Sequence, residues 1–388
     1  MYKIQTLNKI SEKGLSLLPA ESYSISEDGT SPDGIILRSF KMHDMEIPES
    51  VKVIARAGAG VNNIPLTTCT EKGIVVFNAP GANANSVKEL VIGAMLTTAR
   101  DFAGGVAWTK TIADEDDVAK VVEKNKSRFA GGEIKGKKLG VIGLGAIGVQ
   151  ISNACLNLGM EVYGYDPYLT LQAAWTISSK INRSDSIEKI LKECDYITVH
   201  VPLNEGTKGI INKENMKLMK KNAVILNFAR GGIIDDAAAV EAVASGQIAK
   251  YVTDFPNNTV IGKENIICVP HLGASTQEAE ENCAEMVAQQ MKDYLENGNI
   301  VNSVNFPSCT LDINGGERII LASHKCNDVL NDLLSGLSEK GIQTEGMASH
   351  HMGEIFYNII EVAKGSDIKD LIDEAGKKDC VIIARVID

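Results

Sequence analysis

The sequence lacks any uninterrupted apolar run approaching the roughly 20 residues that a membrane-spanning helix needs. Its opening segment, MYKIQTLNKI, lacks the basic stretch, apolar core and small-residue cleavage site of a secretory leader. Internal repeats, low-complexity tracts and proline-rich linkers are absent too. We therefore expect a soluble cytoplasmic protein, and its 388 residues suggest two to three domains.

Close cysteine pairs are also absent, although the chain has eight cysteines. They are scattered at Cys69, Cys155, Cys194, Cys268, Cys283, Cys309, Cys326 and Cys380. Zinc sites and redox motifs usually show CxxC spacings, and cytoplasmic thiols are usually kept reduced. We therefore expect buried, reduced thiols and no metal site.

Positive charge is in deficit, because the formal net charge at pH 7 is −11. An acidic surface repels nucleic acid and anionic membranes, which argues against both as partners. A small anionic ligand would need a local group of basic side chains.

Short apolar runs alternate with amphipathic helical stretches along most of the chain. GIILRS, VKVIARAG and IVVFNAP precede residue 80, whereas KLGVIGLG, EVYGYDP, YITVHVPL, AVILNFARGG and IICVPHLG follow residue 137. Strands that are apolar throughout are typical of parallel sheets with helices on both faces. We predict two doubly wound, Rossmann-like α/β domains with a cleft between them.

Two long helices are expected to join these domains. Ser86 and Glu89 fit the S-x-x-E capping box, so one helix should begin there. The other follows PHLGAS and leads back. The prediction is a discontinuous substrate-binding domain at 1–86 and 276–305, around a dinucleotide-binding domain at 87–275.

The last part of the chain has a different pattern. Its strand and helix signals follow the order βαββαβ, which is typical of the ferredoxin-like arrangement. We predict a third, small domain over residues 316–388.

Gly143, Gly145 and Gly148 spell G-x-G-x-x-G directly after a predicted strand and before a helix. This spacing provides a tight turn, close approach to a pyrophosphate and free helix-terminal N–H groups. Asp166 ends the next strand, where a carboxylate accepts hydrogen bonds from the adenosine ribose and repels a 2′-phosphate. The pattern predicts NAD as the cofactor.

Two further residues follow apolar strands at the edge where such sheets bind ligands. Arg230 in NFARGG offers a guanidinium that can hold a carboxylate. His271 in PHLGAS can exchange a proton with a substrate hydroxyl. His200 in TVHVPL also ends a strand, but we assign it a structural role.

These segments, with ILRS, ARAGAGVNN, VPLNEGTKGIIN and NFARGGIID in the same order, resemble the D-isomer-specific 2-hydroxyacid dehydrogenases over essentially the whole chain. The resemblance implies that His271 is the acid/base and Arg230 the substrate-orienting arginine. It implies cofactor contacts at Gly143, Gly145, Ala146, Ile147, Gly148, Asp166, Val201, Pro202, Phe228, Ala229, Arg230, Asp254, His271, Gly273 and Ala274. It implies substrate contacts at Arg38 and Arg56, near a phosphate, and along Ala57, Gly58, Ala59 and Gly60, near a carboxylate.

The segment TDFPNN departs from the family pattern. Members usually carry a Glu-Pro pair here, and that glutamate pairs with the catalytic histidine. The nearest alignment places Asn258 at this position, and Glu264 is the alternative. Because an amide can orient imidazole but cannot stabilise imidazolium by charge, we expect His271 to be a weaker acid catalyst but a competent base. Ala146, where many members have arginine, removes one cationic contact to pyrophosphate.

The C-terminal region resembles an ACT domain, a small-molecule regulatory module. His324 and Asn327 are of the residue types that bind serine in such domains, but the usual Pro-Gly is missing. The resemblance therefore suggests serine as an effector, and the family implies a homo-oligomer, either dimer or tetramer.

Two alternatives stay open for the whole chain. One is reduction of an unphosphorylated ketoacid such as hydroxypyruvate or glyoxylate, which has less use for Arg38 and Arg56. The other is an NAD-sensing binding protein, which the missing glutamate favours, whereas Arg230, His271 and the attached regulatory domain favour an enzyme.

Overall fold

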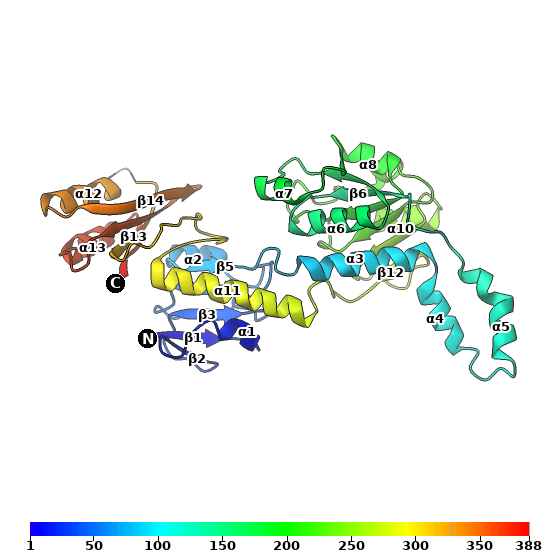
Figure 1. Ribbon diagram of the computed structural model, residues 1–388, viewed down its shortest axis with the longest axis horizontal. Helices are drawn as coiled ribbons and strands as arrows, with labels where there is room; N and C mark the ends of the chain where they lie inside the picture. Colours follow the sequence, from blue (N-terminus) through cyan, green and yellow to red (C-terminus); the bar gives the residue numbers. More distant parts are fainter. Residues whose placement is uncertain (327, 388) are drawn as a thin grey trace. The chain divides into compact units, whose positions relative to one another are not determined.

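The computed structural model describes residues 1–326 and 328–387. The chain forms two compact units, one made of residues Met1–Asn83 with Gln277–Asp388 and the other of residues Ala84–Thr276 (Figure 1). Each unit is built on its own parallel sheet.

The first unit contains a five-stranded parallel sheet in the order β2-β1-β3-β4-β5. One face packs on α11 and the other on α2. The elements are β1 (Tyr2–Thr6), α1 (Glu12–Leu15), β2 (Tyr23–Ser26), β3 (Gly34–Leu37), β4 (Val53–Arg56), α2 (Leu66–Glu71), β5 (Val75–Phe77) and α11 (Gln277–Asn297).

The second unit contains a seven-stranded parallel sheet in the order β12-β11-β10-β9-β6-β7-β8. Helices α3 and α6 cover one face, and α8, α9 and α10 cover the other. The strands are β6 (Lys138–Ile142), β7 (Glu161–Tyr165), β8 (Asn182–Arg183), β9 (Tyr196–Val199), β10 (Val224–Asn227), β11 (Lys250–Thr253) and β12 (Ile266–Cys268). The helices are α3 (Ala84–Ala99), α4 (Phe102–Lys110), α5 (Val118–Asn125), the 3-10 turn η1 (Lys126–Phe129), α6 (Ala146–Asn157), α7 (Leu171–Thr176), α8 (Ile187–Glu193), α9 (Lys213–Met216) and α10 (Asp236–Ala244).

The first unit also carries a four-stranded antiparallel sheet in the order β14-β15-β13-β16. Its chain order is βαββαβ, which confirms the predicted ferredoxin-like arrangement. The elements are β13 (Glu317–His324), α12 (Val329–Glu339), β14 (Thr344–Met352), β15 (Ile355–Val362), α13 (Lys369–Gly376) and β16 (Val381–Ile387). Together with the two parallel sheets, this confirms the predicted fold class.

Two local expectations are wrong. Helix α3 begins at Ala84, so Ser86 lies inside the helix and its buried hydroxyl makes no capping bond among the described residues. Cys326 and Cys380 form a disulfide, with their Cα atoms 6.4 Å apart, so reduced thiols are not found throughout. The prediction for Ser86 failed because α3 begins two residues before it. The disulfide was not predicted because its two cysteines are 54 positions apart in the sequence.

Among the described residues, no single helix is both long and apolar enough to cross a membrane. Only α3 and α4 taken together reach that length and composition, and they are bent by 70° at their break. Helices α4 and α5 extend away from the seven-stranded sheet and bury none of their residues (Figure 1).

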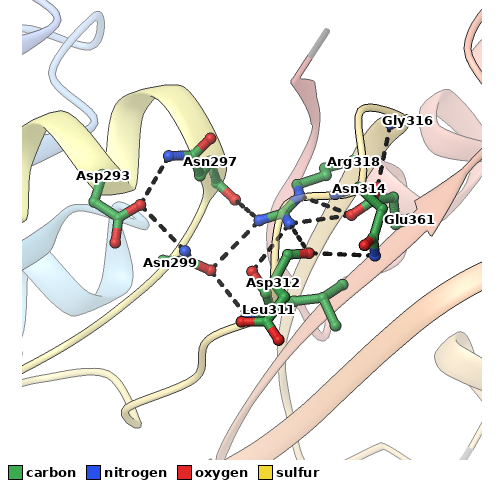
Figure 2. Close-up of polar contacts among 9 residues, drawn as sticks. All are labelled: Asp293, Asn297, Asn299, Leu311, Asp312, Asn314, Gly316, Arg318 and Glu361. Carbon is green, nitrogen blue, oxygen red and sulfur yellow. Dashed lines mark hydrogen bonds and ion pairs between the residues drawn. The ribbon is translucent and has the colours of Figure 1, made fainter.

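A buried ion pair fixes the antiparallel sheet to the segment that follows α11 (Figure 2). The Arg318 guanidinium lies 3.0 Å from the Glu361 carboxylate, and both side chains are buried. Arg318 also donates to the carbonyl oxygens of Asn297 at 2.9 Å and Leu311 at 3.0 Å, and Glu361 accepts the Gly316 N–H at 3.2 Å. Each charge is thus met both by its partner and by backbone groups, as a buried pair requires.

Removing one partner of this pair should be strongly destabilising. Glu361→Gln leaves the Arg318 charge buried and unpaired, so we expect a loss of about 3–5 kcal/mol in the free energy of unfolding. The exposed pair Lys213–Glu241 is the control, since Glu241→Gln should cost less than about 1 kcal/mol. Equal losses in urea unfolding for the two variants would contradict this account.

Candidate functional site

The glycine turn after β6 is shaped to receive a phosphate. Gly143 has φ of +93°, and a Cβ there would lie 2.7 Å from the His200 carbonyl oxygen. A Cβ on Gly148 would collide with the Gly143 carbonyl. Gly145 instead faces open space, with nothing within 4 Å of its Cβ direction. The turn thus has two glycines that pack and one that leaves room for a ligand.

Helix α6 begins at Ala146, directly after this turn. Among the described residues, no side chain caps its first turn, so its leading N–H groups stay available to an anion. Ile147 is half-buried and Ala146 exposed beside them. The residues present therefore fit a dinucleotide pyrophosphate.

Asp166 is held at the end of β7, next to the glycine turn. Its Oδ2 accepts the Leu144 N–H at 2.7 Å, and its Oδ1 accepts the Tyr168 N–H at 2.8 Å. Each carboxylate oxygen retains a lone pair for a further donor, such as a ribose hydroxyl. The side chain is thus preoriented by backbone groups.

Arg230 lies in a turn that a buried amide braces. The Asn227 side chain, 1% exposed, donates to the Arg230 carbonyl at 2.9 Å and accepts the Ala229 N–H at 3.2 Å. The exposed Arg230 guanidinium donates to the Ala229 carbonyl at 2.7 Å. Sequence reasoning missed Asn227, although its place at the end of β10 was the available signal.

His271 lies three residues beyond β12 and is exposed. Its ring packs on Phe255, with 4.6 Å between ring centroids. Phe255 was not predicted as a site residue, and it fixes one face of the imidazole. Gly273 is buried, Ala274 half-buried, and the Ser275 hydroxyl donates to the His271 carbonyl at 3.4 Å.

Asp254 lies beside this histidine at the end of β11. It is 1% exposed, and neither carboxylate oxygen has a hydrogen-bond partner among the described residues. Burial raises the pKa of Asp254 above its ordinary value, and the charge of His271, the nearby N–H groups of Gly273 and Asp254 and the charge of Arg230 oppose that rise. A Cβ on Gly273 would lie 3.4 Å from its Oδ2, so glycine lets the chain pass close by. An unsatisfied buried carboxylate here fits a donor from a ligand.

The structure gives no support to Asn258 as the partner of His271. Asn258 and Glu264 are both exposed, and no hydrogen bond or ion pair joins either to His271 in the part of the chain described. Both assignments stay predictions.

His200 is built into the fold. Its Nε2 lies 2.8 Å from the Thr198 hydroxyl, and burial lowers the pKa of His200 to about 3. It is therefore neutral at physiological pH, which suits the structural role. The neighbouring Val201 is half-buried, Pro202 exposed and Phe228 buried.

In the first unit, Arg38 directly follows β3, and Arg56 is the last residue of the adjacent strand β4. The Arg56 Nε donates to the Arg38 carbonyl at 3.0 Å, which holds the two residues together. Gly58 has φ of +155°, and a Cβ there would collide with the Arg56 guanidinium. Ala57 is buried, while Ala59 and Gly60 are half-buried in the same loop.

Three residues that sequence reasoning missed support this cationic pair. The Asn8 amide oxygen accepts the N–H groups of Arg38, Ser39 and Phe40 at 2.9–3.1 Å. The Asn63 amide donates to the Arg38 carbonyl at 3.3 Å. The Arg38 guanidinium pairs with Glu280 of α11 at 2.5 Å. The arrangement can bind an anion that displaces the Glu280 carboxylate.

Of the two predicted effector residues, His324 is exposed at the end of β13, and its backbone N–H donates to the Cys380 carbonyl at 2.8 Å. Asn327 lies outside the described residues. Serine binding stays a prediction.

Comparison with known proteins agrees with this geometry. The sequence model of the D-isomer specific 2-hydroxyacid dehydrogenase NAD binding domain matches residues 92–273, which confirms the predicted cofactor. The chain is 42% identical over 270 residues to a D-3-phosphoglycerate dehydrogenase of Methanocaldococcus jannaschii, covering 68% of this chain and 49% of that protein. It is 32% identical over 330 residues to the Bacillus subtilis D-3-phosphoglycerate dehydrogenase, covering 80% and 60%.

The chain thus spans about half the length of these relatives. Among solved structures, it resembles the NAD+-bound 3-phosphoglycerate dehydrogenase of Entamoeba histolytica, with a TM-score of 0.61 and 27% identity, covering 78% of this chain and 98% of that one.

Neutralising Asp254 and neutralising Asp166 should change the free energy of unfolding in opposite directions. The pKa of Asp254 is raised in the folded protein. The free energy of unfolding should therefore fall as the pH rises from the ordinary carboxyl pKa to the raised pKa of Asp254. Asp254→Asn should therefore raise the free energy of unfolding at pH 7, by about 1–3 kcal/mol.

Asp166→Asn is the matched control, since it weakens two backbone hydrogen bonds and should lower stability. Urea unfolding at pH 7 and pH 4 measures both. A destabilised Asp254→Asn at pH 7 would contradict the account of an unsatisfied carboxylate.

Proposed function

We propose, from the premise that this chain belongs to the D-isomer specific 2-hydroxyacid dehydrogenase family, that it oxidises D-3-phosphoglycerate to 3-phosphohydroxypyruvate with NAD. This oxidoreductase reaction is the entry to serine biosynthesis. The observation that carries the proposal is the pair Arg38 and Arg56, joined by a 3.0 Å hydrogen bond at the ends of adjacent strands. Two guanidinium groups beside one loop suit a substrate with a phosphate as well as a carboxylate.

The residues of the second unit provide the proton transfer. His271, exposed and packed on Phe255, takes the proton from the substrate hydroxyl. Arg230 holds the carboxylate and polarises the forming carbonyl. When bound, NAD supplies the hydride acceptor. Asp254 presents its buried carboxylate to the same site and can accept a hydrogen bond from the bound ligand.

The phosphate is the feature that separates this substrate from its rivals. The backbone of Ala57 to Gly60 suits the carboxylate, and Arg38 and Arg56 suit the phosphate. The proposed reaction requires the arginine-containing half-site of the first unit and the cofactor half-site of the second unit to bind one substrate together. The cleft between the two domains, which the sequence predicts, stays a prediction.

The first test compares NADH consumption with 3-phosphohydroxypyruvate, hydroxypyruvate, glyoxylate and 2-oxoglutarate. We expect kcat/KM to favour the phosphorylated ketoacid by about 100-fold or more, because charge-assisted hydrogen bonds contribute about 1.5–3 kcal/mol each. Preference for an unphosphorylated ketoacid would contradict the proposal. If NADH binds but none of the four ketoacids causes NADH consumption, the result would favour the alternative of an NAD-sensing protein.

Glu280 should compete with the substrate phosphate for Arg38. Glu280→Gln removes that carboxylate, so we expect the KM for the phosphorylated ketoacid to fall about two- to fivefold, the size expected for an exposed ion pair. Glu285→Gln, which removes another acid of α11, is the control and should leave KM unchanged. A higher KM in Glu280→Gln would show that Glu280 holds Arg38 in its working position.

A carboxylate restored at position 258 tests the missing charge. If Asn258 stands where the family glutamate does, Asn258→Glu should raise kcat/KM for ketoacid reduction at pH 8 by about five- to tenfold, equivalent to roughly 1–1.4 kcal/mol for a partly solvated ion pair. The pH profile of kcat/KM for this variant should extend to higher pH than that of the unsubstituted protein. Glu264→Gln should change neither quantity, and an unchanged Asn258→Glu profile would remove Asn258 from the site.

The expected partners and location are part of this proposal. A homo-oligomer is supported by α4, which buries no residue and leaves Phe102 68% and Val106 42% exposed. Cytoplasmic location, serine as an effector and the ACT-like character of the C-terminal domain stay predictions.

A further inference from the structure

We propose that Cys326 and Cys380 form a reversible redox pair that controls how firmly the C-terminal strand β16 holds helix α11. Cys326 follows β13 by two residues, and Cys380 directly precedes β16. Their bond therefore ties together one end of two neighbouring antiparallel strands. Both cysteines are half-buried, so a small disulfide or dithiol can reach them.

The disulfide should matter for the stability of β16 because of where this strand lies in its sheet. β16 lies at the edge of its sheet and pairs with β13 alone among the described strands. Its pairing with β13 is irregular at Ala322 and Ser323, close to the cysteines. An edge strand with an interrupted register gains more from a covalent tie than a central strand does.

β16 also makes a direct contact with α11. The Arg385 guanidinium donates to the Tyr294 carbonyl at 2.8 Å and lies 4.4 Å from the centre of the Tyr294 ring. At the other end of α11, Glu280 pairs with Arg38 at 2.5 Å. A single helix thus links the strand that the disulfide holds to the proposed phosphate-binding arginine.

The chemistry needs only an external disulfide, such as oxidised glutathione. One cysteine thiolate attacks the external disulfide, releases one external thiolate and forms a mixed disulfide. The other cysteine thiolate then displaces the second external thiol and closes the Cys326–Cys380 bond. Two protein thiols are oxidised, one external disulfide is reduced to two thiols, and an external dithiol reverses the sequence.

The other cysteines do not compete for this chemistry. Burial raises the pKa of Cys155 and Cys194 to about 12 and that of Cys69 and Cys309 to about 11. It also raises the pKa of the Cys268 and Cys283 thiols, so all six free thiols are disfavoured as thiolates. In the cytoplasmic location that the sequence predicts, a disulfide is typically transient or redox-sensing. The pair therefore fits a switch.

The test uses the full chain in glutathione buffers of graded redox poise. Differential alkylation followed by peptide mass spectrometry should show Cys326 and Cys380 changing together, with the loss of two hydrogens on oxidation. Hydrogen exchange in the same samples should become roughly tenfold faster on reduction, in β16 and in the C-terminal half of α11.

Cys380→Ser should show the fast exchange in every buffer, and Cys326→Ser is the second variant if the first folds poorly. Cys268→Ser, at the partly exposed thiol of the other unit, should keep the switch intact. Absence of the cross-link at every poise would overturn the proposal, as would a cross-link that leaves α11 exchange unchanged. Neither readout needs turnover, so the outcome is independent of the proposed activity.

Discussion

The packing of α11 is the interaction on which the first unit depends. The buried face of α11 packs on the five-stranded parallel sheet, and it contributes Ala284, Val287, Ala288, Met291, Tyr294 and Leu295 to one continuous core. The same core includes Ile320 and Tyr357 of the antiparallel sheet, and the Tyr357 hydroxyl donates to the Gly298 carbonyl at 2.6 Å. Because a buried Leu or Met truncated to Ala costs about 2–5 kcal/mol, a fault in this helix would loosen both sheets.

This packing also connects the proposed substrate half-site to the C-terminal domain. Glu280 lies in the first turns of α11, where it meets Arg38, and Tyr294 lies near its end, where it meets Arg385. The buried Arg318–Glu361 pair fixes the segment beyond the helix to the antiparallel sheet (Figure 2). One helix therefore contacts both Arg38 and the C-terminal domain.

Much of the candidate site follows from the rule that parallel sheets present ligands at the carboxyl ends of their strands. Arg38, Arg56, Asp166, Arg230 and His271 could be predicted because each directly follows an apolar run. Their supports could not, because Asn8, Asn63 and Glu280 reach Arg38 from distant parts of the chain.

The cysteine pair and the buried ion pair were missed for the same reason. Cys326 and Cys380 are neighbours only because β13 pairs with β16, and Arg318 meets Glu361 across β13 and β15. Periodicity in the sequence predicts that these strands exist, but the register between them decides which side chains meet. The orphaned Asp254 carboxylate likewise depends on how Gly273 passes over β11.

The most direct test of the proposed chemistry follows the hydride itself. Reduction of 3-phosphohydroxypyruvate with NADH that carries deuterium at the transferred position should yield D-3-phosphoglycerate with deuterium at C2. Product of the L configuration, or D product without the label, would contradict direct hydride transfer in a site built around His271 and Arg230.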